Sequence, residues 1–220
     1  MGKTICICGN ESVLRAHIIR GLAERDYQIL ITESEQLDEK REPEEKCHYY
    51  HISTFTSIRV RSLFMKGIRD FGGIDGVILV HTPGREHSPI HEIPAVTIEN
   101  AVDSASKGYM YIAKEALSYF IKRKQGALSF VVAEEIETLS SLDAVLAGGF
   151  RALADSLFHM YQNEPIIING YESRGANPEL YADFVVRIMT EKEKQPKGRW
   201  LHFSDRQGLF QNITIPKLGK

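Results

Sequence analysis

The sequence is poor in cysteine and has no long apolar segment. Only three cysteines occur in 220 residues, and Cys6 and Cys8 are too close together on one strand to bridge easily, so we expect reduced thiols in a cytoplasmic protein. No apolar run approaches the roughly 18 residues that a membrane helix needs, which argues against a membrane-spanning protein. The N-terminus leads directly into an apolar strand pattern, so we expect no signal peptide.

The sequence also lacks an excess of charge of one sign. The 27 Lys and Arg residues nearly balance 29 Asp and Glu residues, and a formal net charge of −2 provides no basic field for nucleic acid. A hydrophobic fraction of 43% and a charged fraction of 25% exclude global disorder. With no internal repeat, we expect one domain over residues 1–220, with a core at about 3–208 and a short tail at 209–220.

Apolar runs that predict strands alternate with segments of helical periodicity. Ser12 is placed to cap the first helix, and the continuous apolar run Val77–Val80 is typical of a strand covered on both faces. Strands are predicted at 4–8, 27–32, 47–52, 77–80, 128–132, 166–168 and 200–203, with long helices at 58–71, 97–124, 142–161 and 178–190. The alternation predicts an α/β fold: a doubly wound parallel sheet in a Rossmann-type three-layer sandwich.

Sheets of this kind bind ligands outside the carboxyl ends of their strands. That rim would carry Gly9–Ser12, Glu33, residues 51–53 and His81–Gly84. The candidate cofactor-binding residues are therefore Gly9, Asn10, Ser12, Arg15, Glu33, Ile52 and His81.

Four passages of the chain resemble short-chain dehydrogenases/reductases. They are ICICGNESVLRAHIIRGLAERDYQILITE, FGGIDGVILVHTPG, GALSFVVAEE and FRALADSLFHMYQNEPIIING, and they follow the order and spacing of that family over about residues 3–208. The resemblance implies a dinucleotide-binding fold that carries oxidoreductase chemistry. The signature residues of the family are mostly absent from the four passages.

The glycine turn of the family, Gly-x-x-x-Gly-x-Gly, is incomplete in this chain. Gly9 holds the first place, but Val13 and Arg15 hold the other two, so the space for a pyrophosphate should be narrowed or refilled. Arg15 is either a solvated helix residue, the reading that we favour, or a ligand for an anion at the helix N-terminus. Glu33 is either part of a run of surface acids or a partner for a ribose hydroxyl, which would favour NAD over NADP.

The catalytic positions that the resemblance implies carry other residues. None of the nine tyrosines has lysine four residues later, and Tyr119, followed by Arg123, lies on the wrong helix. The tyrosine and lysine places fall on Asp143 and Ala147, the serine place on Ala133 and the asparagine place on Ala105. We therefore expect no catalytic residue of the family type.

Two other groups have weaker patterns. His81, His87 and His91 match no zinc motif, so we interpret them as loop histidines and expect no metal site. Glu134, Glu135 and Glu137 follow the fifth strand, where paired carboxylates would suit acid–base chemistry, but a solvated loop is the plainer interpretation.

The leading interpretation is a non-catalytic relative of the reductases that binds a small molecule or a protein. The alternatives are an NAD-dependent oxidoreductase with non-standard catalytic residues and a structural subunit of an active homologue. We expect no cofactor, or NAD rather than NADP if one binds. Neither nucleic acid nor a membrane is expected as a partner.

The helices at about 97–124 and 142–161 have apolar residues on more than one side, which predicts a homodimer or homotetramer built on them. Gly148 and Gly149 within the second helix either allow a close approach of another helix or mark an irregular helix start near Phe150.

Overall fold

A computed structural model describes residues 2–33, 46–52, 54–84, 88–134, 140–191 and 196–204. Within these ranges, seven parallel strands form one sheet in the order β3-β2-β1-β4-β5-β6-β7. The strands are β1 (Thr4–Gly9), β2 (Gln28–Glu33), β3 (Cys47–His51), β4 (Gly76–His81), β5 (Ala127–Glu134), β6 (Ile167–Arg174) and β7 (Trp200–Phe203). The helices are α1 (Val13–Ala23), α2 (Ser57–Phe71), η1 (Ile90–Glu92), α3 (Ala95–Ala101), η2 (Val102–Lys107), α4 (Gly108–Arg123), α5 (Ser141–Met160) and α6 (Pro178–Thr190).

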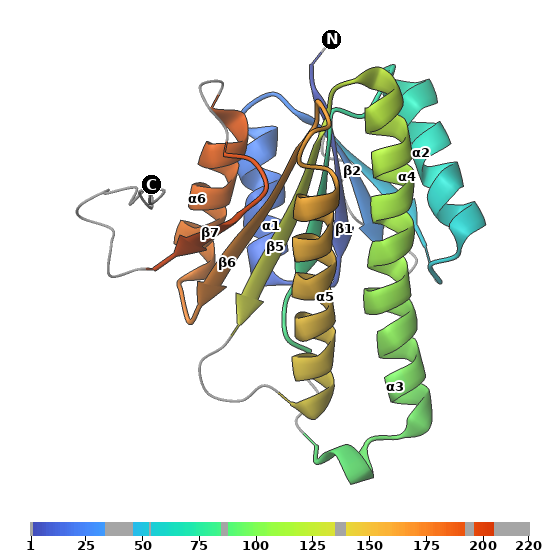
Figure 1. The fold of residues 1–220 in the computed structure, drawn as a ribbon, viewed down its shortest axis with the longest axis vertical. Coiled ribbons are helices and arrows are strands. Elements are labelled where there is room, and N and C mark those ends of the chain that lie inside the picture. The colour runs from blue at the N-terminus through green and yellow to red at the C-terminus, as the bar shows by residue number, and fades with distance from the viewer. Residues whose placement is uncertain are drawn as a thin grey trace.

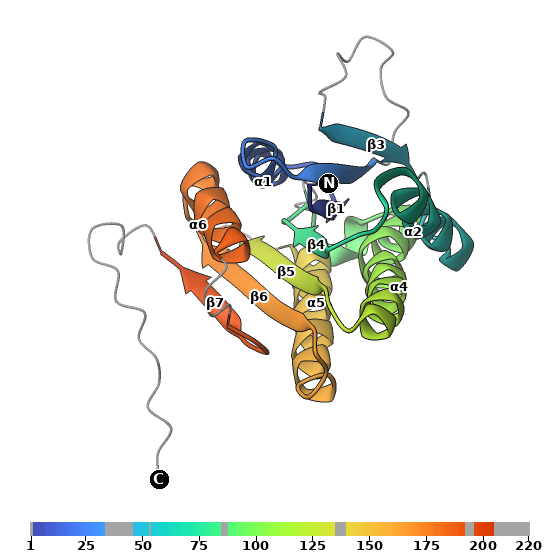
Figure 2. The same ribbon diagram turned by 90° about the horizontal axis from the view of Figure 1, so that it is seen from above.

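Helices cover the sheet on both faces (Figures 1 and 2). On one face, α2, α4 and α5 pack on strand residues that include Cys6, Leu79 and Phe130. On the other face, α1 and α6 pack on residues such as Ile7 and Val80. Because neighbouring residues of one strand enter opposite cores, the strands are apolar without interruption, as expected for a parallel sheet buried on both sides. The predicted three-layer Rossmann-type α/β fold is confirmed.

The helix predicted over residues 97–124 is divided into three parts. It begins as α3 after Pro94, widens into the π-helical turn η2 and continues as α4. A small satellite core of Ile93, Leu142 and Leu146 attaches the segment before α4 to the start of α5. Figure 1 shows this segment beyond the end of the sheet toward which the arrows of β5 and β6 point, so it lies near the carboxyl rim.

Several sequence predictions fall on parts of the chain that are not described. These are the tail at 209–220 and most of the run of acids that begins at Glu33. In the described ranges, no helix is long and apolar enough to cross a bilayer.

Candidate functional site: the crevice between the first and fourth strands

The strand order reverses its winding between β1 and β4, and we call the region outside the carboxyl ends of these two strands the crevice. From β1 the chain proceeds to β2 and β3 on one side, whereas β4 begins the series β4 to β7 on the other side. Such a reversal of winding is where open α/β sheets bind ligands. Two loops border this point, Asn10–Ser12 after β1 and Thr82–Gly84 after β4.

Gly9 is required by the close approach of these two strands. A Cβ atom at this position would lie 2.0 Å from the carbonyl oxygen of Val80. The φ angle of +144° would also be strained for any residue other than glycine. The structure therefore explains Gly9 by the packing of β1 against β4.

Ser12 caps α1, as the sequence predicts. Its hydroxyl accepts a hydrogen bond from the Arg15 backbone N–H at 3.2 Å, and α1 then runs for 11 residues. Val13, at the first helical position, is 62% exposed. The N-terminus of α1, which is suited to negative charge, thus borders the crevice, and the Val13 side chain is largely in solvent.

The interpretation of Arg15 as a solvated helix residue is wrong. Its side chain is only 3% exposed, and its guanidinium Nη2 donates to the carbonyl oxygen of Thr32 near the end of β2. Its Nε is buried and has no hydrogen-bond partner among the residues that the structure describes. The side chain turns back from the first turn of α1 toward the sheet, so a fixed positive charge lies beneath this part of the crevice.

Glu33 and Ile52 lie where β2 and β3 end. Glu33 is only 8% exposed, so it is not one of a run of surface acids. The Ile52 N–H donates to the Glu33 carbonyl at 2.7 Å, and the Ile52 side chain belongs to the core. Both residues close the ladder between the two strands at the rim.

His81 ends β4 and is buried beneath the rim. Its ring stacks on Phe150 with centroids 5.4 Å apart, and its Nδ1 lies 3.5 Å from the hydroxyl of Tyr109. Tyr109 donates to the Val80 carbonyl at 2.9 Å. Burial, aided by the nearby Cys8, raises the pKa of Tyr109 above its usual range, so this phenol holds its proton tightly.

The four residues that the resemblance assigned to catalytic positions lie on three different elements. Ala105 lies in the π-helical turn η2, Ala133 near the end of β5 and Ala147 in α5. Asp143, in the first turn of α5, is 5% exposed. Its carboxylate accepts from the Gly84 N–H at 2.8 Å and from the Ser140 hydroxyl at 2.7 Å, so it is occupied by contacts within the protein.

Sequence reasoning missed how strongly the loop after β4 is held. The Asn10 side chain donates to the Thr82 carbonyl at 2.9 Å and accepts from the Thr82 N–H at 3.3 Å. The partners are 72 residues apart in sequence, and an asparagine after a strand is not a specific signal for such a pairing.

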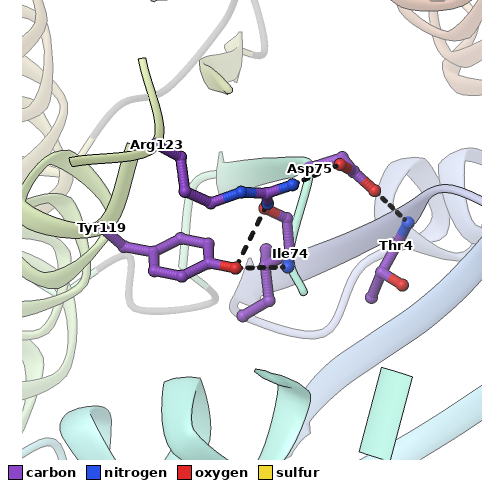
Figure 3. Close-up of polar contacts among 5 residues, drawn as sticks. All are labelled: Thr4, Ile74, Asp75, Tyr119 and Arg123. Atoms are coloured by element: carbon purple, nitrogen blue, oxygen red, sulfur yellow. Dashed lines mark hydrogen bonds and ion pairs between the residues drawn. The ribbon is translucent and has the colours of Figure 1, made fainter. Parts of the chain in front are cut away.

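The pair Tyr119 and Arg123 lies near the amino ends of β1 and β4, and Figure 3 shows its polar contacts. Arg123 Nη1 donates to the Ile74 carbonyl at 2.8 Å and to the Tyr119 hydroxyl at 3.2 Å. Asp75 accepts from the Thr4 N–H at 2.9 Å and lies 3.6 Å from Arg123 Nη2. Because Asp75 precedes β4, about 20 Å of strand separates the cluster from the carboxyl rim. The pair braces the fold and is remote from the crevice.

No group of three His, Cys, Asp or Glu residues suited to a metal ion is present among the described residues. His91 has an exposed side chain in η1, whereas His81 is buried, and His87 lies outside the described residues. The side chains of Glu134, Glu135 and Glu137 also lie outside them.

A shallow groove of about 260 Å³ lies between α4 and α5, away from the crevice. Its lining is mostly apolar and includes Met110, Leu117, Leu153 and Leu157.

The fold is shared with short-chain dehydrogenases/reductases of known structure. ElxO, solved with NADP bound, has a TM-score of 0.78 at 16% identity over 92% of this chain and 97% of ElxO. The 3-ketoacyl-(acyl-carrier-protein) reductase from Brucella melitensis, complexed with NADH, has a TM-score of 0.79 at 10% identity, covering 91% of this chain and 96% of the reductase. A short-chain dehydrogenase from Leptospira borgpetersenii with bound NAD+ has a TM-score of 0.76 at 11% identity, covering 92% and 91%. No family model and no curated protein sequence matches the chain.

These structures correct the expectation that no cofactor binds. Neighbours with the same fold hold NADP, NADH or NAD+, so neither the absence of a cofactor nor a restriction to NAD follows from the sequence. The physical reason is that the crevice is formed by strand ends and a helix N-terminus. This chain retains both features although Val13 and Arg15 replace two glycines.

Proposed function

We propose that this protein binds a nicotinamide adenine dinucleotide in the crevice between β1 and β4 and does not perform the tyrosine–lysine reaction of the reductases that it resembles. The proposal rests chiefly on the Ser12-capped N-terminus of α1 at the winding reversal of a fold in which solved neighbours hold NADP or NADH.

The residues at the crevice fit the anionic part of such a ligand. The first turn of α1 presents backbone N–H groups and the positive end of the helix dipole. The buried Arg15 guanidinium adds a cation whose Nε has no partner in the described part of the chain. A bound dinucleotide supplies hydride chemistry, whereas these residues supply only binding and orientation.

The proposed lack of turnover follows from the residues near the ends of β4 and β5. Alanine at 105, 133 and 147 provides neither a hydroxyl, an amide nor an amine. The Asp143 carboxylate is held by Gly84 and Ser140. Tyr109 and His81 form a hydroxyl–imidazole pair, but the raised pKa of Tyr109 makes this phenol a poor proton donor. The protein would act as a dinucleotide-dependent binding module.

Calorimetry with NAD, NADH, NADP and NADPH tests binding directly. We expect at least one nucleotide to bind with a micromolar dissociation constant, about −8 kcal/mol. Val13→Glu adds a negative charge at an exposed position of the crevice and should weaken binding at least fivefold through repulsion of the phosphates. Ile58→Glu, at a 77% exposed position of α2, is the matched control and should leave the affinity unchanged. Absence of heat with all four nucleotides would refute the binding proposal.

Turnover separates a binding module from an oxidoreductase with non-standard residues. With NADH or NADPH and a panel of ketones and aldehydes, we expect no oxidation above the background rate. Robust oxidation that disappears in Tyr109→Phe would favour the oxidoreductase and would make the Tyr109–His81 pair its proton relay.

We also propose that α4 and α5 form a homodimer interface. Exposed small residues follow a spacing of four along α5, at Ala144, Gly148, Ala152 and Ser156. The apolar groove lies beside them, and Met110 and Val145 are 48% and 69% exposed. Tyr109, Phe150 and Phe158 on the same two helices are core residues and do not contribute to this surface.

A further inference from the structure

We propose that Asn10 and Asp143 are positioning residues that fix the backbone of Thr82–Gly84 as a preformed wall of the dinucleotide crevice. The inference rests on the proposed function and assigns a role to two side chains that the chemistry of the site leaves unused. Neither side chain needs to touch the ligand.

Asn10 holds the beginning of this wall. Its side-chain amide forms hydrogen bonds with both backbone polar groups of Thr82. It donates to the carbonyl oxygen at 2.9 Å and accepts from the N–H at 3.3 Å. The ladder between β1 and β4 ends at the pair Gly9 and Val80, so the Asn10 side chain continues the connection beyond the last strand pair.

Asp143 holds the end of the wall from the opposite layer of the fold. One carboxylate oxygen accepts from the Gly84 N–H at 2.8 Å, and the other accepts from the Ser140 hydroxyl at 2.7 Å. The Asp143 N–H in turn donates to the Ser140 hydroxyl oxygen at 3.1 Å, so the carboxylate is fixed by the cap of α5. A Cβ atom on Gly84 would lie 3.0 Å from the Asp143 oxygen, which makes glycine the suitable residue for this contact.

Every backbone N–H of the wall is therefore accounted for. Those of Thr82 and Gly84 donate to Asn10 and Asp143, and Pro83 has none. A segment held at both ends, with a proline between them, loses little conformational freedom when a ligand binds beside it. Because these N–H groups already have partners, the wall has none to donate to a phosphate. The anionic part of the ligand must therefore bind at α1 and Arg15.

The test is a fluorescence titration of NADPH and NADH against full-length variants. Asn10→Ala and Asp143→Ala should each raise the dissociation constant about tenfold, or about 1.4 kcal/mol, because the wall must then be ordered on binding. Asp143→Asn retains an oxygen acceptor for the Gly84 N–H and should restore the affinity to within about threefold of the original protein. This rescue distinguishes a positioning role from a need for negative charge.

Asp155→Ala is the matched control. Asp155 is also an aspartate of α5 with a partner on another element, because it accepts from Trp200 Nε1 at 2.7 Å, but it lies three turns from Asp143. This variant should lose stability without a change in dissociation constant. Asn10 is exposed, so Asn10→Ala provides a folded variant even if Asp143→Ala does not fold.

The outcomes separate the two proposals. If the unaltered chain binds neither NADPH nor NADH, the proposed function and this inference both fail. If it binds one of them, and Asn10→Ala and any folded Asp143→Ala bind that nucleotide as tightly as the unaltered chain does, only the positioning role is overturned. An equal loss of affinity in Asp155→Ala would also overturn it, since a general loss of stability would then explain the effect.

Discussion

Arg123 stabilises the amino ends of β1 and β4. Its pairing with Tyr119 resembles a catalytic tyrosine–lysine pair. Its guanidinium binds the Ile74 carbonyl and the Tyr119 hydroxyl and lies over the Tyr119 ring at 5.2 Å from the centroid (Figure 3). Asp75 extends the brace to the first residue of β1. The cluster thus connects the end of α4 to the starts of β4 and β1, which is a structural role.

Replacing Arg123 should therefore affect stability alone. We expect Arg123→Ala to lower the free energy of unfolding by about 1–3 kcal/mol, because the Ile74 carbonyl and Asp75 lose a charged donor. Urea unfolding measures the loss, and Arg61→Ala, at an exposed position of α2, should remain within about 0.5 kcal/mol of the original protein. A weaker affinity of Arg123→Ala for dinucleotide would contradict the assignment of this cluster to the fold.

At the scale of elements, α5 is unusual because two adjacent glycines lie in its middle. The helix is continuous from Ser141 to Met160, so an irregular start near Phe150 is excluded. A Cβ atom on Gly148 or Gly149 would meet none of the described residues within 4 Å, so packing against these residues requires neither glycine. Each costs up to about 1 kcal/mol of helix stability relative to alanine. A second α5 packed closely against this face would explain both.

The dimer proposal predicts that a leucine on α5 dissociates the dimer, whereas a leucine on α2 does not. Gly148→Leu has room in the single chain and should leave it folded, but it should convert a dimer to a monomer by preventing close approach. Light scattering at micromolar concentration gives the mass, and circular dichroism gives the folded state. Ser62→Leu, which adds the same side chain at an exposed position of α2, should leave the mass unchanged. A monomeric mass for the original protein would contradict the proposed interface on α5.

At the scale of the whole molecule, local patterns were sufficient to predict the layers. The apolar run Val77–Val80 falls within β4, and Ser12 caps α1, because burial on both faces and helix capping leave signals within a few residues. The π-helical turn η2 was not predicted, since nothing in Val102–Lys107 is specific to that geometry.

The site was less predictable because its contacts join distant parts of the chain. The burial of Arg15 depends on where β2 ends, 17 residues later in sequence. The contact between Gly84 and Asp143 spans 59 residues. The glycine pattern led to the wrong expectation of no cofactor because it describes one loop, whereas the crevice also depends on strand order and on the position of α1.

A crystal structure of the full chain grown with saturating NADPH tests the central claim most directly. The account predicts the nucleotide at the carboxyl rim between β1 and β4, with its pyrophosphate at the first turn of α1 and with the Thr82–Gly84 wall in the position described above. An empty crevice at saturating nucleotide, or a nucleotide bound elsewhere on the molecule, would contradict the account.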